Sequence, residues 1–251
     1  MTRNAAKVAL ARLAASLIWL IALALPVHAA DQALLNMLGY SADGNYFAFE
    51  EFGIQDGSGF AFSTVYVIDL ANDKWTYGTP FSVVGADEDM SLADVRAEAM
   101  DKAGDKLDEY KIGVPVQILT LTGDGVADEN GTRAHWSTPS CCGPGQVQAD
   151  AFDLILTTRG IGSDEAYCQD MSPVGFTLSY QDSAGVRELH QDGDTLPKSR
   201  RCTLDYRIYA VVQPFNELYI DGFTARRVAI IATYPFGFEG VDRRFLAVPI
   251  D

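Results

Sequence analysis

Apolar and polar residues alternate with a period of two over much of the second half of the chain. In the segment 204–210 the even-numbered residues are apolar and the odd-numbered ones are Asp, Arg and Tyr, which is typical of a strand with one buried face. The segment 114–121 is apolar at most positions and predicts a buried strand. We therefore expect strands at 114–121, 152–157, 176–180, 186–190, 204–210, 228–234 and 243–248.

The first half of the exported chain begins with a predicted hairpin between residues 38 and 75. Residues 41–45, Ser-Ala-Asp-Gly-Asn, form a tight turn in this interpretation, because Asp and Asn side chains bond to their own backbone and Gly adopts positive φ. The aromatic segment 46–49 follows, a second turn is expected at 56–59, and 65–70 is the return strand.

One segment has the spacing of a helix. Ser91 and Asp94 resemble a capping box at a helix N-terminus. Apolar residues then recur at intervals of three and four, while charged residues take the other faces. The pattern predicts one amphipathic helix over residues 91–111, ended by Gly113 and lying on a sheet with its charged face in water.

Strands joined by turns rather than by helices indicate antiparallel sheets. We expect a mainly β (α+β) fold, in a sandwich or propeller-like arrangement, with one long helix near residues 91–111. Residues 30–251 fit a single domain. The Gly-, Pro- and Ser-rich segment 132–148 is expected to be a surface loop tied down by disulfides.

The first 29 residues have the three-part pattern of a secretory signal peptide. Basic residues stand at the start, an uncharged apolar stretch covers 13–25, and Val27-His28-Ala29 precedes a cleavage site before Ala30. The apolar stretch is shorter than the roughly 20 residues that a membrane-spanning helix needs. We expect cleavage, export to the periplasm or the exterior, and no stable membrane insertion afterwards.

The chain is strongly acidic, with a formal net charge of -15. Loss of Arg3, Lys7 and Arg12 with the signal peptide lowers the charge by three, to about -18. Such a field repels nucleic-acid phosphates, so nucleic acid is not an expected partner. Cations, basic partners or simple solubility fit the charge better, and we expect a protein or glycan partner.

Four cysteines, Cys141, Cys142, Cys168 and Cys202, lie in the exported part of the chain, where disulfides are the expected state. A bridge between the adjacent Cys141 and Cys142 would close a strained ring. We therefore expect each of them to pair with one of Cys168 and Cys202, in either arrangement. The alternative is a metal or redox site at the adjacent pair, with His135 nearby.

The segment 124–131, Asp-Gly-Val-Ala-Asp-Glu-Asn-Gly, resembles a single acidic calcium repeat of the thrombospondin type. Asp124, Asp128 and Asn130 could supply oxygen ligands for weak Ca²⁺ binding. The segment departs from the EF-hand pattern, because His135 stands where the twelfth-position Glu is required. The alternative is a polar hairpin loop, and no other cofactor is expected.

Two arginine pairs, Arg226-Arg227 and Arg243-Arg244, stand out in so acidic a chain. On strands each pair splits between the two faces. If the two strands are adjacent, one Arg from each could form a patch that binds a carboxylate or phosphate. The alternative is ion pairing with Glu239 and Asp242.

No catalytic set is evident in the sequence. It contains no G-x-S-x-G elbow, and only His135 and His190 remain after loss of the signal peptide. Glu50 and Glu51 are adjacent, so on a strand their side chains point to opposite faces and cannot form a glycosidase pair with each other.

Several segments are similar to a family of predicted secreted bacterial proteins, domain of unknown function 2259. They are Gly39-Tyr40-Ser41, the segments 47–53, 56–59 and 66–69, and the closing segment 237–245. This resemblance implies export and no particular activity. The segments 40–49 and 65–69 also resemble a single blade of a TolB-type β-propeller.

We therefore expect an exported protein of unknown function, most simply a non-enzymatic binding or interaction protein of the bacterial envelope. One alternative is a secreted hydrolase that uses carboxylates, which a deep pocket with two carboxylates of opposed pKa shifts would favour. Another is a calcium-stabilised structural module. An exposed aromatic patch around Phe47, Phe49, Phe60 or Phe62 would favour binding.

Overall fold

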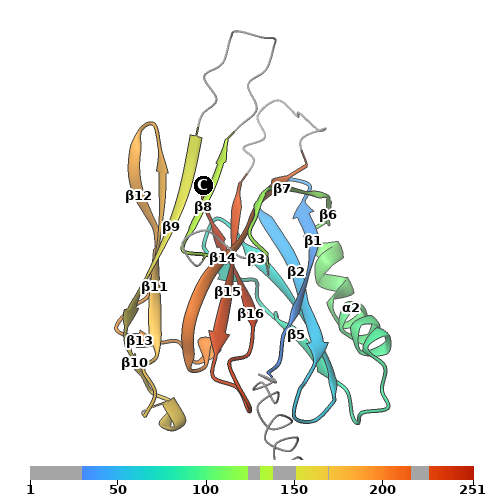
Figure 1. The fold of residues 1–251 in the computed structure, drawn as a ribbon. Coiled ribbons are helices and arrows are strands. Elements are labelled where there is room, and N and C mark those ends of the chain that lie inside the picture. Colours follow the sequence, from blue (N-terminus) through green and yellow to red (C-terminus); the bar gives the residue numbers. More distant parts are fainter. Residues whose placement is uncertain (1–29, 124–130, 138–150, 169, 216–225) are drawn as a thin grey trace, which may run out of the picture.

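The computed structural model describes residues 30–123, 131–137, 151–168, 170–215 and 226–251 (Figure 1). Three antiparallel sheets are stacked face to face, and helix α2 (Leu92–Glu109) covers the outer side of the first sheet. The prediction of a mainly β fold with antiparallel sheets and one long helix is confirmed, and the arrangement is a sandwich of stacked sheets.

Each sheet draws on a different part of the chain. The helix-side sheet has the order β4-β3-β2-β1-β6, with β5 also paired to β3: β1 is Leu34–Ser41, β2 Tyr46–Ile54, β3 Ala61–Asp69, β4 Lys74–Trp75, β5 Phe81–Val84 and β6 Ile112–Val114. The middle sheet has the order β16-β15-β14-β7: β7 is Val116–Leu121, β14 Thr203–Pro214, β15 Val228–Pro235 and β16 Arg244–Pro249. The far sheet has the order β12-β11-β9-β8: β8 is Arg133–Ser137, β9 Ala151–Gly160, β11 Val174–Asp182 and β12 Gly185–Gln191. The short strands β10 (Gly162–Ser163) and β13 (Thr195–Leu196) pair in parallel, and η2 (Ala166–Cys168) and η3 (Lys198–Arg200) are single 3₁₀ turns.

The middle sheet is buried on both faces. Ile231 packs with the far sheet and Ile230 with the helix-side sheet, so neighbouring residues of β15 belong to different cores. This explains why the segment 228–232 is an uninterrupted apolar run rather than an alternating one. The expectation of a buried strand at 114–121 is wrong, because β7 is an edge strand with Ile118 and Leu121 half exposed.

Helix α2 confirms the helical spacing and its start. The Ser91 Oγ accepts a hydrogen bond from the Asp94 backbone N–H and caps the helix. Small buried residues, among them Ala99 and Ala103, let the helix lie close to the helix-side sheet. The helix ends earlier than Gly113, because Lys111 already has a φ of 52°.

The expected surface loop at 132–148 is wrong in its first part. Residues 133–137 form strand β8, in which Ala134 and Trp136 are buried and alternate with exposed neighbours. The Gly- and Pro-rich composition that follows obscured this short alternation. Residues 138–150 lie outside the described part of the chain.

The disulfide expectation needs correction. Cys168 and Cys202 are bonded to each other, so neither is paired with Cys141 or Cys142, which lie outside the described residues. Ring strain argues against a bond between the adjacent Cys141 and Cys142, but it does not indicate which cysteines the fold brings close together. The bond joins η2 to the residue that precedes β14.

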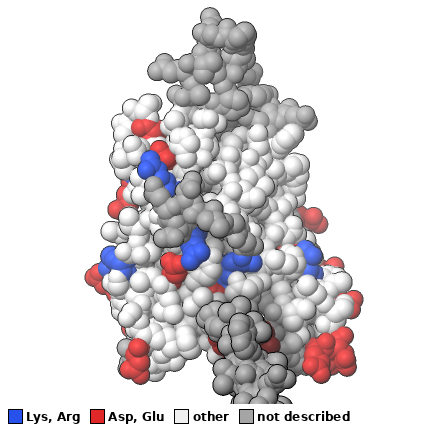
Figure 2. Space-filling model, in the orientation of Figure 1, with Lys and Arg blue, Asp and Glu red and all other residues white. Residues whose placement is uncertain are grey.

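Acidic and basic residues are interspersed on the face shown in Figure 2, with wide areas that carry neither. Acidic residues gather at its lower right, where Figure 1 places the turn before α2. That turn contains the exposed residues Asp87, Glu88 and Asp89. Part of the negative charge is therefore concentrated in a solvated turn.

Candidate functional site

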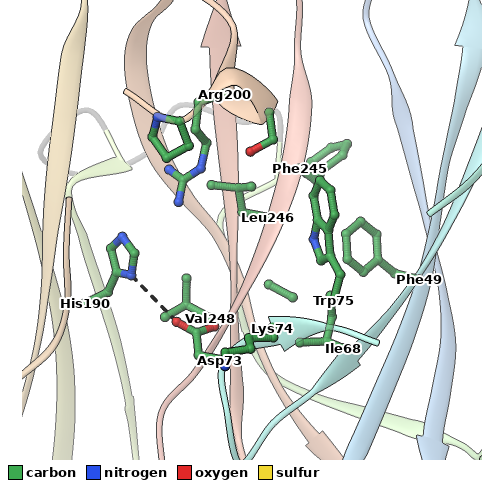
Figure 3. Close-up of a pocket in the computed structure, with 13 residues that line it drawn as sticks. Phe49, Ile68, Asp73, Lys74, Trp75, His190, Arg200, Phe245, Leu246 and Val248 are labelled. Carbon is green, nitrogen blue, oxygen red and sulfur yellow. Dashed lines mark ion pairs between the residues drawn. The ribbon is translucent and has the colours of Figure 1, made fainter. Parts of the chain in front are cut away.

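The strongest candidate site lies where the edges of the three sheets meet. Strands β4, β16 and β12 are each the edge strand of their sheet. A pocket of about 300 Å³ opens between them, lined by residues of β4, β12, η3 and β16 and by Phe49 and Ile68 of the helix-side sheet (Figure 3). Its volume is at the lower limit of typical small-molecule sites.

One wall of this pocket is aromatic. Trp75, Phe49 and Phe245 lie together on one side of the cavity (Figure 3). Tyr66 connects two of them, with its ring centroid 5.6 Å from that of Trp75 and 4.8 Å from that of Phe49. Trp75 remains 43% exposed, so a ligand could stack on it without displacing the core.

The opposite wall carries His190 and Arg200 (Figure 3). The His190 Nε2 lies 3.0 Å from the Asp192 Oδ1, and its Nδ1 lies 3.7 Å from the Asp73 Oδ2. Burial alone would lower the pKa of His190, but the Asp192 and Asp73 carboxylates outweigh burial and raise the pKa to about 9. His190 is therefore a fixed cation at neutral pH.

Asp192 holds this wall together. Its side chain is almost fully buried, accepts a hydrogen bond from the Phe176 backbone N–H at 2.9 Å and lies 3.6 Å from the Arg200 Nη1. Burial acts to raise the pKa of Asp192, but the His190 hydrogen bond and the Arg200 charge dominate and lower it. The wall is thus a buried carboxylate with two cations placed around it.

Replacing His190 with glutamine should destabilise the protein in a pH-dependent way. The folded-state pKa lies above the unfolded value, so the ionic contribution is complete below about pH 6.5 and is lost as the pH rises through about 9. The difference in unfolding free energy between wild type and His190→Gln should narrow by at most about 3 kcal/mol between pH 6 and pH 10. Urea unfolding at each pH measures this, with the exposed His135→Gln as control, and a pH-independent difference would refute the ionic role.

A second, polar pocket of about 130 Å³ adjoins the first and shares Trp75, Arg200 and Phe245 with it. Its lining includes three arginines, Arg200, Arg201 and Arg244. We call the two cavities together the paired pocket. Its charged half and its aromatic half lie side by side along β16.

Glu51 lines the polar pocket and is buried. Its carboxylate accepts hydrogen bonds at 3.0 Å from the Tyr66 hydroxyl and from the Phe245 backbone N–H. Burial raises the pKa of Glu51, and the charge of Arg244 opposes this. Glu50 points to the other face and binds Arg96 of α2, as expected for neighbouring strand residues.

The groups in and around the paired pocket that could take part in hydrolysis have other partners in the structure. Both ring nitrogens of His190 face carboxylates, so the imidazole is not available as a base at neutral pH. Glu51 and Asp192 have opposite pKa shifts, but Asp192 does not line either cavity of the paired pocket. Among the described residues, Ser199 forms no hydrogen bond with His190.

The four arginines predicted as a patch do not come together. The register pairs Val228 with Pro249 and Thr233 with Arg244, so Arg227 and Arg244 lie at opposite ends of the β15–β16 pair. Arg227 binds Asp251, and the buried Arg243 donates to the Ala33 carbonyl. Arg226 is only half buried and is not a lining residue of the paired pocket. Of the four, Arg244 alone lines the paired pocket, 2.9 Å from Asp31 and 4.0 Å from Asp242.

Other predicted features lie elsewhere. His135 is exposed and contacts Asp153 at 3.1 Å. Phe47, Phe49 and Phe62 are buried in the core, so they form no exposed aromatic patch. Asp124, Asp128 and Asn130 lie outside the described residues. Within the part of the chain that the structure describes, no group of three His, Cys, Asp or Glu side chains could hold a metal ion.

Sequence reasoning missed Trp75, Arg200 and Arg201 as site residues and placed His190 outside any site. One signal was present, because the segment 198–201 reads Lys-Ser-Arg-Arg and is the densest basic run outside the leader of an acidic chain. The juxtaposition of β4 with β12 and β16 has no signal in the sequence, because it arises only in the folded chain.

The fold and site define a sandwich protein of three stacked sheets with a ligand-sized paired pocket at the aligned sheet edges. The chain belongs to a family described as predicted secreted protein, domain of unknown function 2259, whose model matches residues 48–251. No curated protein and no solved structure matches the chain. None of the described helices is long and apolar enough to cross a membrane.

Proposed function

We propose that this protein is an exported, non-enzymatic binding protein whose paired pocket holds an organic anion with an apolar part. The acid group lies against Arg200, and the apolar part lies against Trp75. The family description as secreted supports export, and we place the protein in the periplasm or outside the cell, where its disulfide is stable.

The observation that carries this proposal is the position of Arg200. Its side chain is 11% exposed and lines both halves of the paired pocket. Its hydrogen bond to the Tyr206 hydroxyl and its ion pair with Asp192 both use Nη1. Nε and Nη2 are then suited to a carboxylate, which accepts two parallel N–H donors from a guanidinium. A negative net charge of the whole chain does not oppose this, because three arginines line the polar half while their acidic partners Asp31, Asp192 and Asp242 are not among its lining residues.

A panel of organic acids tests the proposal. The protein should bind acids that carry an aromatic or alicyclic group, and the matched methyl ester or amide should bind about 10-fold to 100-fold more weakly. Trp136 is buried and Trp75 is exposed. In protein that lacks residues 1–29, and with them Trp19, a Trp136→Phe background therefore makes Trp75 the fluorescence reporter. Calorimetry gives the dissociation constants independently.

Two variants locate the site. Arg200→Gln should weaken acid binding by at least about 10-fold, and Trp75→Ala should weaken it without a large loss of stability. Arg207→Gln is the matched control, because Arg207 is exposed on β14, beside Asp205 and away from the paired pocket. If no acid in the panel binds at millimolar concentration, or if Arg207→Gln weakens binding as much as Arg200→Gln, the proposal fails.

A further inference from the structure

A trench runs along the whole of edge strand β16. The polar half of the paired pocket borders Arg244, Phe245 and Leu246, and the larger half borders residues 245–248. A third cavity of about 200 Å³ borders Pro249, Ile250 and Asp251 and shares Asp73 with the larger half. The three cavities therefore follow one another along a single strand.

The backbone of β16 is open at one position in this trench. The Phe245 N–H points away from β15, because it donates to the Glu51 carboxylate, and the Ile250 N–H points toward β15, where it donates to the Arg227 carbonyl. N–H groups on one edge of a strand recur at every second residue, so the outer edge carries those of residues 245, 247 and 249. The Glu51 carboxylate already accepts the hydrogen bond of the Phe245 N–H, and Pro249 has no N–H. Ala247 therefore presents its N–H and C=O to the pocket that it lines.

The two ends of the trench differ in charge. At the Arg244 end, three arginines and the carboxylate of Glu51 line the cavity. The acidic partners of these arginines, Asp31, Asp192 and Asp242, lie behind the lining. At the Asp251 end, the carboxylates of Asp73, Glu188 and Asp251 and the guanidinium of Arg187 line the cavity. The other cations that pair with these carboxylates, Arg227 and His190, do not line this cavity. This polarity matches an extended peptide with its C-terminal carboxylate at the first end and its N-terminal ammonium at the second.

We propose that the ligand of the paired pocket is a short peptide with a free C-terminus, which binds along β16 as an added antiparallel strand. This inference rests on the proposed function and names its ligand class. Antiparallel addition agrees with every strand pair of the middle sheet. At about 3.3 Å per residue, a peptide of about six residues faces residues 246–251 and places its carboxylate toward the Arg244 end.

The geometry also favours a particular type of residue at the penultimate position of the peptide. The Glu51 carboxylate occupies the place of a peptide carbonyl next to the Phe245 N–H, so the added strand ends beyond the residue opposite Ala247. Ala247 packs toward the helix-side sheet. The penultimate peptide residue, opposite Ala247, therefore points toward Trp75, Phe49 and Ile68 and should be aromatic or aliphatic.

Four hexapeptides test the inference with the purified, oxidised protein and calorimetry. The reference peptide is Ser-Thr-Ser-Thr-Phe-Ser with both termini free. Its C-terminal amide should bind at least about 10-fold more weakly. The form that is N-methylated at Phe loses the donor to the Ala247 carbonyl and should bind about 10-fold more weakly. A fourth peptide with Asp in place of Phe should also bind more weakly.

Ala247→Pro is the matching protein variant, because it removes an N–H that points away from β15, in the way that Pro249 already lacks one. It should weaken the reference peptide about 10-fold more than it weakens a small aromatic acid, whose carboxylate contacts Arg200 and not the backbone of Ala247. If aromatic acids bind through Arg200 but N-methylation and Ala247→Pro have no effect, the peptide inference is overturned and the proposed function stands. If neither acids nor peptides bind, both fall.

Discussion

Replacing Arg96 with alanine should lower the free energy of unfolding by about 2–3 kcal/mol. The Glu50 side chain is fully buried, and Arg96 binds both of its oxygens at 2.8 Å. Asn36 and Ser63 donate the remaining hydrogen bonds to this carboxylate. Without Arg96 a buried negative charge would lose its cation, although water could replace part of it because Arg96 is 35% exposed.

Lys102→Ala on the same helix is the control. Lys102 forms an exposed pair with Glu98 at 2.7 Å, one turn apart, and such pairs contribute about 0.5 kcal/mol or less. Burial acts to raise the pKa of Glu50, but hydrogen bonds from Arg96, Asn36 and Ser63 outweigh it and lower the pKa. The ionic contribution is therefore present above about pH 4.5 and lost as the pH falls. Equal costs for Arg96→Ala and Lys102→Ala in urea unfolding at pH 7 would contradict this assignment.

Replacing Cys168 and Cys202 together with serine should cost about 4 kcal/mol, the loop entropy expected for residues 34 positions apart. Both cysteines are buried, so the serine hydroxyls add a desolvation cost. Because Cys202 directly follows Arg200 and Arg201, the double variant should also bind organic acids more weakly than wild type.

Thermal and urea unfolding with and without reductant measure this effect. The double variant is its own control, because any response that it still shows to reductant comes from cysteines other than Cys168 and Cys202. The expectation is met if reductant lowers the stability of the wild type to that of the double variant and leaves the stability of the double variant unchanged. A double variant as stable as the oxidised wild type would contradict it.

The elements of this fold could largely be predicted from local pattern, but their layers could not. Helix α2 was predictable because Ser91 caps it and its apolar spacing is regular. The segments of β7 and β15 look alike in sequence, yet one is a half-exposed edge strand and the other is buried on both faces. That difference depends on which strand lies inside the sheet, and pairing between distant segments decides it.

The candidate site was hidden for the same reason. Trp75 belongs to a strand of only two residues. His190 lies in β12, the edge strand of the far sheet, and Phe245 lies in the last strand of the chain. None of these residues has a motif, because each acquires its role from the alignment of three sheet edges. The adjacent glutamates are the exception, since strand geometry alone separates Glu50 from Glu51.

The order of the three sheets along the chain has a consequence for how the protein is made. The helix-side sheet is complete by Val114 and the far sheet by Gln191, whereas three of the four strands of the middle sheet come after residue 202. Aromatic faces such as Phe47 on one side and Phe176 on the other are therefore synthesised and translocated before the layer that covers them both. A nascent chain cannot reach its final state from the N-terminus onward, and folding is completed only when the last segment has been released.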